Sequence, residues 1–287
     1  MRSALTGLAV AAATVATTFL TPAHAGAAPA YAEYVALGDS FAAGPFVPVQ
    51  NSAAVTCLQS FDNGYPARLA ALLGVRSFRN VTCSGAKAQD FDKSGSGWGR
   101  SGAAQYDALT AETDLVTLTI GANDAGLFQD LLGCLNPLPE QHASPCVDRF
   151  TAGGADQLAA KVDASAAIIG STLDEIARRA PRARIAITSY GKYLPPGGCL
   201  TPTTPIQPRD ADYLQTTIDR LGDRIAEQAA AHGGTFVDLR TASLGHDACA
   251  AAAERWIEPL APASPAAPFH PNARGGQAFA GLIAAAL

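Results

Sequence analysis

Short β-type segments alternate with segments of helical periodicity, and this alternation constrains the fold more than any other feature. Strand-forming residues cluster in five segments, 34–37, 78–82, 114–120, 184–190 and 234–239. Apolar residues recur at helical spacing over 65–73, 158–176 and 212–231. Because strands that alternate with helices pair in parallel through right-handed crossovers, we predict an α/β fold with a helix–sheet–helix sandwich around five parallel strands.

Turns of small residues follow the first three predicted strands, at 38–40, 84–86 and 121–124. The carboxyl ends of parallel strands meet at one edge of the sheet, and ligands bind beyond that edge. We therefore expect the three turns to converge on one site.

The N-terminus has the pattern of a secretory signal peptide. A basic start is followed by an uncharged stretch over 4–20 and by the small-residue site Ala23-His24-Ala25. A membrane anchor is the alternative, but the stretch is barely long enough to span a bilayer and ends at a cleavage site. We expect residues 1–25 to be removed and 31–287 to form a single extracellular domain.

The net charge of the chain after the predicted signal peptide argues against one class of binding partner. Without Arg2 this part of the chain has 19 basic and 25 acidic residues. This mild acidity argues against nucleic acid as a partner, because binding a phosphate backbone needs a clustered positive field.

All six cysteines follow the leader, which suits an oxidising compartment. Six cysteines allow fifteen pairings, and the sequence does not choose among them rigorously. We favour sequential pairing, because each bond would then hold one Gly/Pro-rich loop region, including the long stretches 135–154 and 194–208. Their spacing does not match zinc ligands, so no metal is expected. The favoured pairs are Cys57 with Cys83, Cys134 with Cys146, and Cys199 with Cys249.

Ser40 is the candidate nucleophile, in the segment Val-Ala-Leu-Gly-Asp-Ser-Phe. It follows a predicted strand at a glycine-flanked turn, with small residues behind it that let a substrate approach. Acyl transfer needs such an exposed hydroxyl, a base within hydrogen-bond reach and donors aimed at the oxyanion. On position alone, a serine that caps a helix explains Ser40 equally well.

His270 is the candidate base among the four histidines that follow the leader. Pro268 and Pro271 restrict the backbone around it, and a rigid loop that presents one imidazole suits a general base. His142, His232 and His246 lie in contexts typical of surface or capping residues.

Two residues after successive strands are candidate oxyanion donors. Asn123 offers a side-chain amide and Gly85 a backbone N–H without a side chain in the way. Each is a common turn former in isolation. A serine, a glycine and an asparagine after successive strands, followed by a C-terminal histidine, form a combination that chance rarely produces.

These four blocks resemble the SGNH, or GDSL, hydrolase family, and in particular its secreted actinobacterial lipases. The match runs through Gly-Asp-Ser40, Cys-Ser-Gly85-Ala, Gly-Ala-Asn123-Asp and Phe-His270-Pro-Asn, across nearly the whole exported chain. The resemblance implies a flavodoxin-like three-layer fold and ester hydrolysis without a cofactor. It also implies an oxyanion hole made of the Ser40 and Gly85 backbone N–H groups and the Asn123 side chain.

One position departs from the family pattern. The family commonly has an aspartate three residues before the histidine, and this chain has Ala267. We therefore expect a Ser40–His270 dyad in which the carbonyl of Ala267 or Pro268 orients the imidazole, as in some relatives. Three carboxylates are rival partners, although nothing in their spacing favours any of them: Asp124, Asp238 and Asp247.

The predicted activity is that of a lipase or esterase on small-molecule ester or lipid substrates, acting as a monomer with transient contact to a lipid interface. A phospholipase, an acyl-xylan esterase and a thioesterase share the same chemistry. A catalytically silent extracellular binding module is the alternative from another class. Seven apolar loop residues are candidates to line an acyl site: Phe46, Val47, Phe128, Leu131, Leu132, Leu135 and Leu138.

Overall fold

The computed structural model describes residues 30–95 and 103–287. The predicted signal peptide, 1–25, lies outside the described residues. Within the described ranges, no helix is both long and apolar enough to cross a bilayer.

The described residues form one five-stranded parallel sheet in the order β2-β1-β3-β4-β5. This is the flavodoxin-like order, so the predicted fold class is confirmed. All five residues of β3 are buried, because helices cover both faces of the sheet. The strands are β1 (Glu33–Gly38), β2 (Ser77–Asn80), β3 (Leu115–Thr119), β4 (Arg184–Thr188) and β5 (Thr235–Val237).

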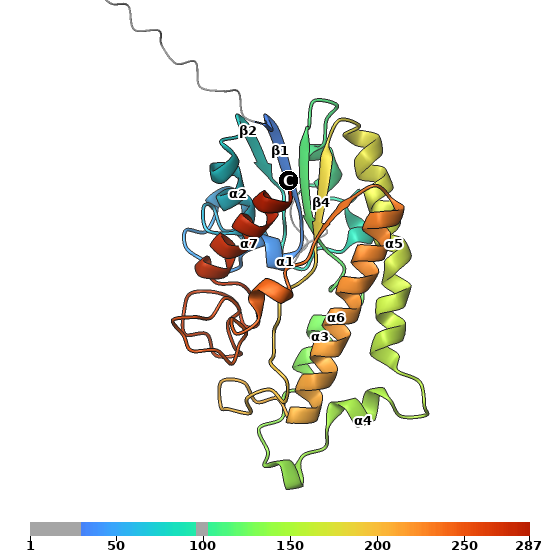
Figure 1. Cartoon of the computed structure of the whole chain (residues 1–287), viewed down its shortest axis with the longest axis vertical. Helices are drawn as coiled ribbons and strands as arrows, with labels where there is room; N and C mark the ends of the chain where they lie inside the picture. Colours follow the sequence, from blue (N-terminus) through green and yellow to red (C-terminus); the bar gives the residue numbers. More distant parts are fainter. Residues whose placement is uncertain (1–29, 96–102) are drawn as a thin grey trace, which may run out of the picture.

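Two pairs of helices enclose the sheet (Figure 1). Helices α2 (Tyr65–Leu73) and α7 (Ala273–Ala286) cover one face, and α5 (Gln157–Arg179) and α6 (Pro208–Ala231) cover the other. Helix α6 begins four residues before the predicted range, because Pro208 occupies its first turn, where a missing N–H costs little.

Shorter helices connect these layers. Three are α-helical: α1 (Ser40–Ala43), α3 (Leu127–Leu132) and α4 (Cys146–Phe150). The 3-10 turns are η1 (Ser52–Cys57), η2 (Ala88–Asp90), η3 (Gln105–Ala108), η4 (Glu140–His142) and η5 (Thr241–Ser243).

Disulfide bonds hold the long loop regions. The structure joins Cys57 to Cys83, Cys134 to Cys146, and Cys199 to Cys249. A second, smaller apolar core lies beneath the two excursions and includes Leu131, Phe150, Leu158, Leu214 and Phe269. The excursions are therefore packed parts of the domain.

Strand order places a crevice beside β1. The chain leaves β1 toward β2 on one side, whereas β3 pairs on the other side, and such a switch point is where ligands bind in this class of sheet. Gly38 ends β1 with a φ of 143°, and a Cβ atom there would lie 2.6 Å from the carbonyl oxygen of Thr119. Only glycine lets the chain turn this close to β3.

Candidate active site

Ser40 is the first residue of α1, directly after the turn that ends β1. The side chain of Asp39 caps this helix by accepting a hydrogen bond of 2.9 Å from the backbone N–H of Phe41. Gln105 holds the same turn from the other side, because its amide both accepts from Gly38 N and donates to Gly38 O. The half-buried hydroxyl of Ser40 is therefore presented from a rigid turn.

His270 lies against Ser40, 230 residues away in the chain, with 2.7 Å between its Nε2 and the Ser40 Oγ. On the far side of the ring, Nδ1 lies 2.7 Å from the carbonyl oxygen of Pro268. A carbonyl can only accept, so Nδ1 carries the proton and Nε2 is left to accept from the serine. Of the two carbonyls considered, Pro268 contacts the imidazole, whereas that of Ala267 accepts from the backbone N–H of His270.

The imidazole lies in an apolar environment that keeps it neutral. His270 is buried, and the ring of Phe128 meets it edge-on at 5.7 Å between centroids. Burial lowers the pKa of His270, and the hydrogen bond to the Pro268 carbonyl opposes this only in part. At neutral pH the imidazole is thus able to take a proton from Ser40.

A buried carboxylate holds the histidine loop without contacting the imidazole. The Glu258 side chain is fully buried and accepts from the amide of Asn272 at 2.7 Å. Its backbone exchanges hydrogen bonds with the loop, donating to His270 O and accepting from Phe269 N, each at 3.0 Å. Phe269 has a left-handed φ of 56°, so the loop needs such support. Sequence reasoning missed Glu258, because its distance from His270 along the chain matches no motif.

The three rival carboxylates are engaged elsewhere. Asp124 accepts from the backbone N–H groups of Ala88 and Gln89, Asp238 pairs with Arg240, and Asp247 accepts from the backbone N–H of Cys249. In the part of the chain that the structure describes, no three His, Cys, Asp or Glu side chains converge as a metal site would require.

The turn that contains Gly85 lies beside the nucleophile turn. Cys83 donates its backbone N–H to the carbonyl of Gly38 at 3.0 Å, and its disulfide to Cys57 anchors the same turn. Gly85 has a φ of 80°, which a residue with a side chain rarely adopts.

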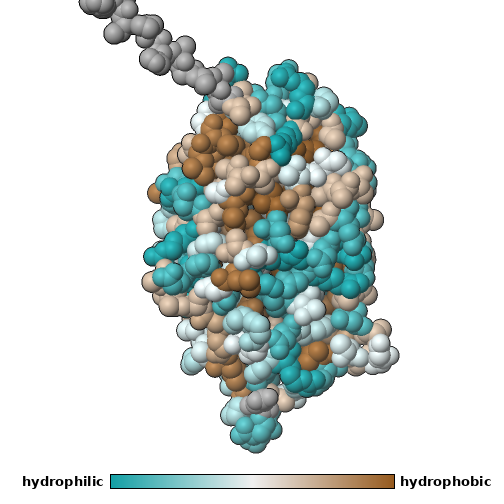
Figure 2. All heavy atoms as spheres, in the orientation of Figure 1, coloured by the Kyte–Doolittle hydropathy of each residue, from teal (hydrophilic) through white to brown (hydrophobic). Residues whose placement is uncertain are grey.

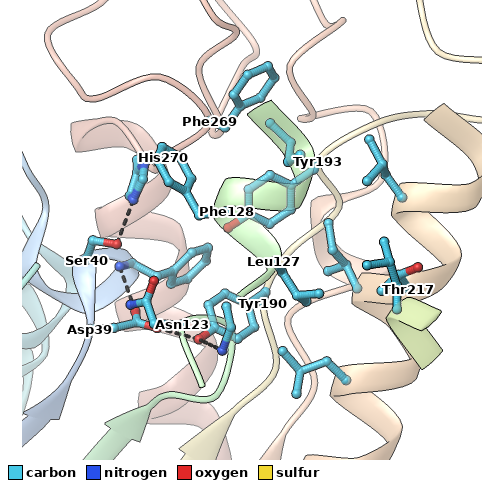
Figure 3. Close-up of a pocket in the computed structure, with 17 residues that line it drawn as sticks. Asp39, Ser40, Asn123, Leu127, Phe128, Tyr190, Tyr193, Thr217, Phe269 and His270 are labelled. Carbon is cyan, nitrogen blue, oxygen red and sulfur yellow. Dashed lines mark hydrogen bonds between the residues drawn. The ribbon is translucent and has the colours of Figure 1, made fainter. Parts of the chain in front are cut away.

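The side chain of Asn123 reaches the same edge from the turn after β3. Its amide donates one N–H to the carbonyl of Ala86 at 3.0 Å, and Asn123 lines the pocket that contains Ser40 (Figure 3). A side-chain amide has two N–H groups, so the second remains for another acceptor. The turns after β1, β2 and β3 therefore meet at one edge of the sheet.

A tyrosine that sequence reasoning missed links two of these turns. The Tyr190 hydroxyl donates to the carboxyl of Asp39 and accepts from the backbone N–H of Ala122 at 3.1 Å. Burial raises the pKa of Asp39 to about 7. Tyr190 stands at the end of a predicted strand, and only the sheet order brings it to Asp39.

An apolar cavity of about 650 Å³, including its open mouth, lies beside Ser40 and His270. Of the seven residues predicted to line an acyl site, Phe128 and Leu131 do so; the prediction was wrong for the other five. Helix α3 turns only one face to the cavity, and α6 supplies the opposite wall with Leu214, Thr217, Ile218 and Leu221. Phe46, Leu132 and Leu138 are exposed instead, Val47 is buried away from the cavity, and Leu135 packs against the second core.

A family profile described as "GDSL-like Lipase/Acylhydrolase family" matches residues 36–278. Among curated proteins, Lipase 2 of Streptomyces coelicolor is 37% identical over 277 residues, covering 91% of this chain and 89% of that protein. A lipase of Streptomyces rimosus is 31% identical, covering 92% of this chain and 93% of that protein.

Solved structures show the same similarity. Phospholipase A1 from Streptomyces albidoflavus NA297 superposes with a TM-score of 0.69 at 25% identity, covering 90% of this chain and all of that one. An extracellular lipase from Streptomyces rimosus superposes with a TM-score of 0.67 at 26% identity, covering 89% of this chain and all of that one.

Proposed function

Because this chain belongs to the GDSL-like lipase/acylhydrolase family, we propose that it is a secreted enzyme that hydrolyses acylglycerol esters. The observation that carries the proposal is the 2.7 Å contact between Ser40 Oγ and His270 Nε2 at the mouth of an apolar cavity. The leader at 1–25 supports export, and N-terminal sequencing of the protein from culture medium should begin after Ala25.

The reaction begins with attack of Ser40 Oγ on the ester carbonyl, while His270 Nε2 takes the serine proton. The imidazolium then gives this proton to the departing alcohol, which leaves an acyl group on Ser40. Water enters, His270 takes its proton, and the acyl-enzyme is hydrolysed to the carboxylic acid by the same route. The Pro268 carbonyl keeps the ring oriented in both halves of the reaction. As a dipole, it stabilises the imidazolium less than a carboxylate would.

Three donors serve the tetrahedral oxyanion in this proposal: the backbone N–H groups of Ser40 and Gly85 and the amide of Asn123. Support comes from the convergence of their turns on one edge and from the amide proton that Ala86 leaves free on Asn123. Such donors act strongly in a site from which water is excluded, and each one contributes ~10²–10³ in rate.

The cavity favours an aliphatic acyl chain over an acetyl group. Leucine and isoleucine side chains from α3, α5 and α6 form much of its wall, and aromatic rings complete it: Phe41, Phe128, Tyr190, Tyr193 and Phe269. An acetyl group would leave most of this apolar surface uncovered, whereas a longer chain would bury it and gain binding free energy. This observation supports the proposal of acylglycerols, rather than acetylated carbohydrates, as substrates.

A phospholipase is the second candidate. The structural similarity to a phospholipase A1 favours this candidate. An apolar acyl cavity suits the fatty acyl chain of a phospholipid as well as that of an acylglycerol. The two classes differ in the group attached to the glycerol, which would lie outside this cavity.

One panel of substrates tests these proposals. Purified protein and the Ser40→Ala variant are assayed against acylglycerols, phospholipids and nitrophenyl esters of increasing chain length. We expect hydrolysis of acylglycerols by the native protein and none by the variant. A fluorophosphonate should label Ser40; absence of an adduct would indicate a catalytically silent binding module and end the enzyme proposal.

A further inference from the structure

The loop between α1 and α2 exposes large apolar side chains beside the catalytic residues. Hydrophobic residues reach the surface at several places, as the brown patches among hydrophilic residues in Figure 2 show. In this loop Phe46 is 52% exposed, Val49 61% and Phe61 66%. Val49 and Phe61 are paired across a short antiparallel bridge between Gln50 and Ser60, with a hydrogen bond of 2.7 Å from Phe61 N to Val49 O. Residues opposite each other in such a pair point to the same side, so the two form one apolar surface.

The loop between α1 and α2 carries one charged side chain, Asp62, whose carboxylate accepts a hydrogen bond of 3.2 Å from the backbone N–H of Val49. An exposed segment of this length normally includes several charged residues, because water solvates them at no cost. A surface with exposed aromatic residues and so little charge suits a neutral lipid interface, whereas an anionic surface would be bound by lysine or arginine, which this loop lacks.

Phe46 has a left-handed backbone, with a φ of 63°. For a bulky side chain this conformation is costly, and burial does not offset the cost here because half of the ring is in solvent. Glycine or asparagine would relieve the strain. An exposed phenylalanine at such a position indicates that its side chain serves a function outside the folded core.

The loop is rigidly joined to both catalytic elements. Ser60 donates its backbone N–H to the carbonyl of Ala43 in α1 at 2.7 Å, and Ala267 donates to the carbonyl of Pro45 at 2.9 Å. The Gln50 side chain and the Cys57–Cys83 disulfide hold the loop itself. A surface that binds through this loop would therefore be held at a fixed place relative to Ser40 and His270.

We propose that Phe46, Val49 and Phe61 form a docking surface for a neutral lipid interface, such as the surface of an acylglycerol droplet. The proposal rests on the proposed function, since it places the enzyme on the phase that contains its substrate. Docking would raise the local concentration of long-chain esters at the cavity without changing the chemical step.

The test compares a Phe46→Asn/Phe61→Ser variant with a control variant, Leu72→Ser/Leu244→Ser. Asparagine tolerates the backbone of residue 46, and the control removes two leucines of similar exposure from α2 and from the loop after η5. Binding to trioleoylglycerol droplets is measured by sedimentation in the Ser40→Ala background. Hydrolysis of those droplets and of a soluble short-chain nitrophenyl ester is measured with Ser40 intact.

We expect the Phe46/Phe61 variant to bind and hydrolyse droplets roughly tenfold less well, while its rate on the soluble ester stays within about twofold. The control should bind as the parent does. Equal droplet binding by the two variants would overturn the proposal. A second result would also overturn it: in analytical ultracentrifugation the native protein is a dimer and the Phe46/Phe61 variant is a monomer, while droplet binding is unchanged. The surface would then join two copies of the chain.

Two features keep the outcome separable from misfolding and from failure of the proposed function. If the Phe46/Phe61 variant is misfolded, it loses its activity on the soluble ester as well. In that case membrane contact is measured instead by the fluorescence of a Phe61→Trp variant in the Ser40→Ala background. Brominated phosphatidylcholine vesicles should quench its fluorescence more than that of the parent; equal quenching would overturn the proposal. If the native protein hydrolyses no ester, the proposed function fails, but droplet binding still tests the surface.

Discussion

The hydroxyl of Tyr190 donates a hydrogen bond to the buried carboxyl of Asp39, the residue directly before Ser40. Because the same hydroxyl accepts from the backbone N–H of Ala122, it joins the nucleophile turn to the turn that contains Asn123. The turns that present Ser40 and its proposed oxyanion donor Asn123 are thereby held by one shared group, although they follow different strands, β1 and β3.

Replacing Tyr190 with phenylalanine should lower kcat about tenfold and leave KM within about twofold. The ring still fills the cavity, but Ala122 N–H and Asp39 lose a partner, at a cost of roughly 1–3 kcal/mol per buried polar group. Steady-state kinetics on a soluble ester measure the effect. Tyr193→Phe is the matched control, since it removes another hydroxyl from the same cavity wall and leaves the Tyr190–Asp39 bond intact. Equal losses of kcat in both variants would contradict the positioning role.

Replacing Asp39 with asparagine should change how stability depends on pH. Burial raises the pKa of Asp39 in the folded protein to about 7, well above its unfolded value, so the folded state holds this proton more tightly. The stability that Asp39 contributes is fully present below about pH 4 and is lost as pH rises to about 7.

Relative to the native protein, Asp39→Asn should therefore gain stability between pH 4 and pH 8, by at most ~4 kcal/mol. Urea unfolding at the two pH values measures the difference. A gap between variant and native protein that stays constant with pH would show that the carboxyl does not titrate in this range.

The pH profile of kcat/KM should keep its acidic limb below the ordinary range of histidine. His270 must be neutral to accept the serine proton, so activity falls as pH drops through its pKa. Burial lowers that pKa, which places half-maximal activity below about pH 6.5. The assay uses a soluble ester. An acidic limb above that value would contradict a lowered pKa of His270. The Asp39→Asn variant is the control: an acidic limb that disappears in this variant reports titration of the Asp39 carboxyl and not of His270.

Replacing Asn123 with alanine should reduce kcat by ~10²–10³ while the protein remains folded. The side chain donates one N–H to Ala86 and is proposed to offer the other to the oxyanion. Kinetics and urea unfolding are measured together, because loss of the Ala86 hydrogen bond alone costs only about 1 kcal/mol of stability. Turnover close to that of the native protein would remove Asn123 from the oxyanion hole.

Asp238→Asn and Asp247→Asn should each retain kcat within about threefold, because neither carboxylate contacts His270 and neither would therefore act in the transition state. Ala267→Asp should bring no large gain, because the Pro268 carbonyl already occupies Nδ1. Strong loss in either asparagine variant would refute orientation by the carbonyl. A large gain in Ala267→Asp would show that the dyad lacks a needed acid.

The sheet was predictable because strand and helix periodicities are local properties of the chain. The predicted segments 114–120, 184–190 and 234–239 contain β3, β4 and β5, whereas 34–37 lies within β1 and 78–82 overlaps β2 with a shift toward the C-terminus. The helix predicted over 158–176 lies within α5. Predicted and observed boundaries differ where a cap or a proline sets the end of an element, as at Pro208, which begins α6 four residues before the predicted range. Ser40, Gly85, Asn123 and His270 were recognisable because each sits in a short motif after a strand or between prolines.

The walls of the cavity were not predictable in the same way. Phe128 and Leu131 are local neighbours of Asn123, but the facing residues Ile218 and Leu221 look like any apolar stripe on a core helix. Phe46 was expected inside an acyl site and lies on the surface. The hydrophobicity of a side chain predicts that it avoids water, but only the packing of the folded chain decides which apolar surface it contacts.

The sequence by itself determined the alternation of strands and helices, the four motif residues and the absence of an aspartate at position 267. These are properties of short segments, and local backbone preferences set them. Only the tertiary structure decided that Pro268 contacts the imidazole, that Glu258 supports its loop and that Tyr190 joins Asp39 to Ala122. Each of these contacts depends on the packing of segments that are far apart in the chain. The number of residues between the partners matches no sequence motif, so the sequence could not reveal them.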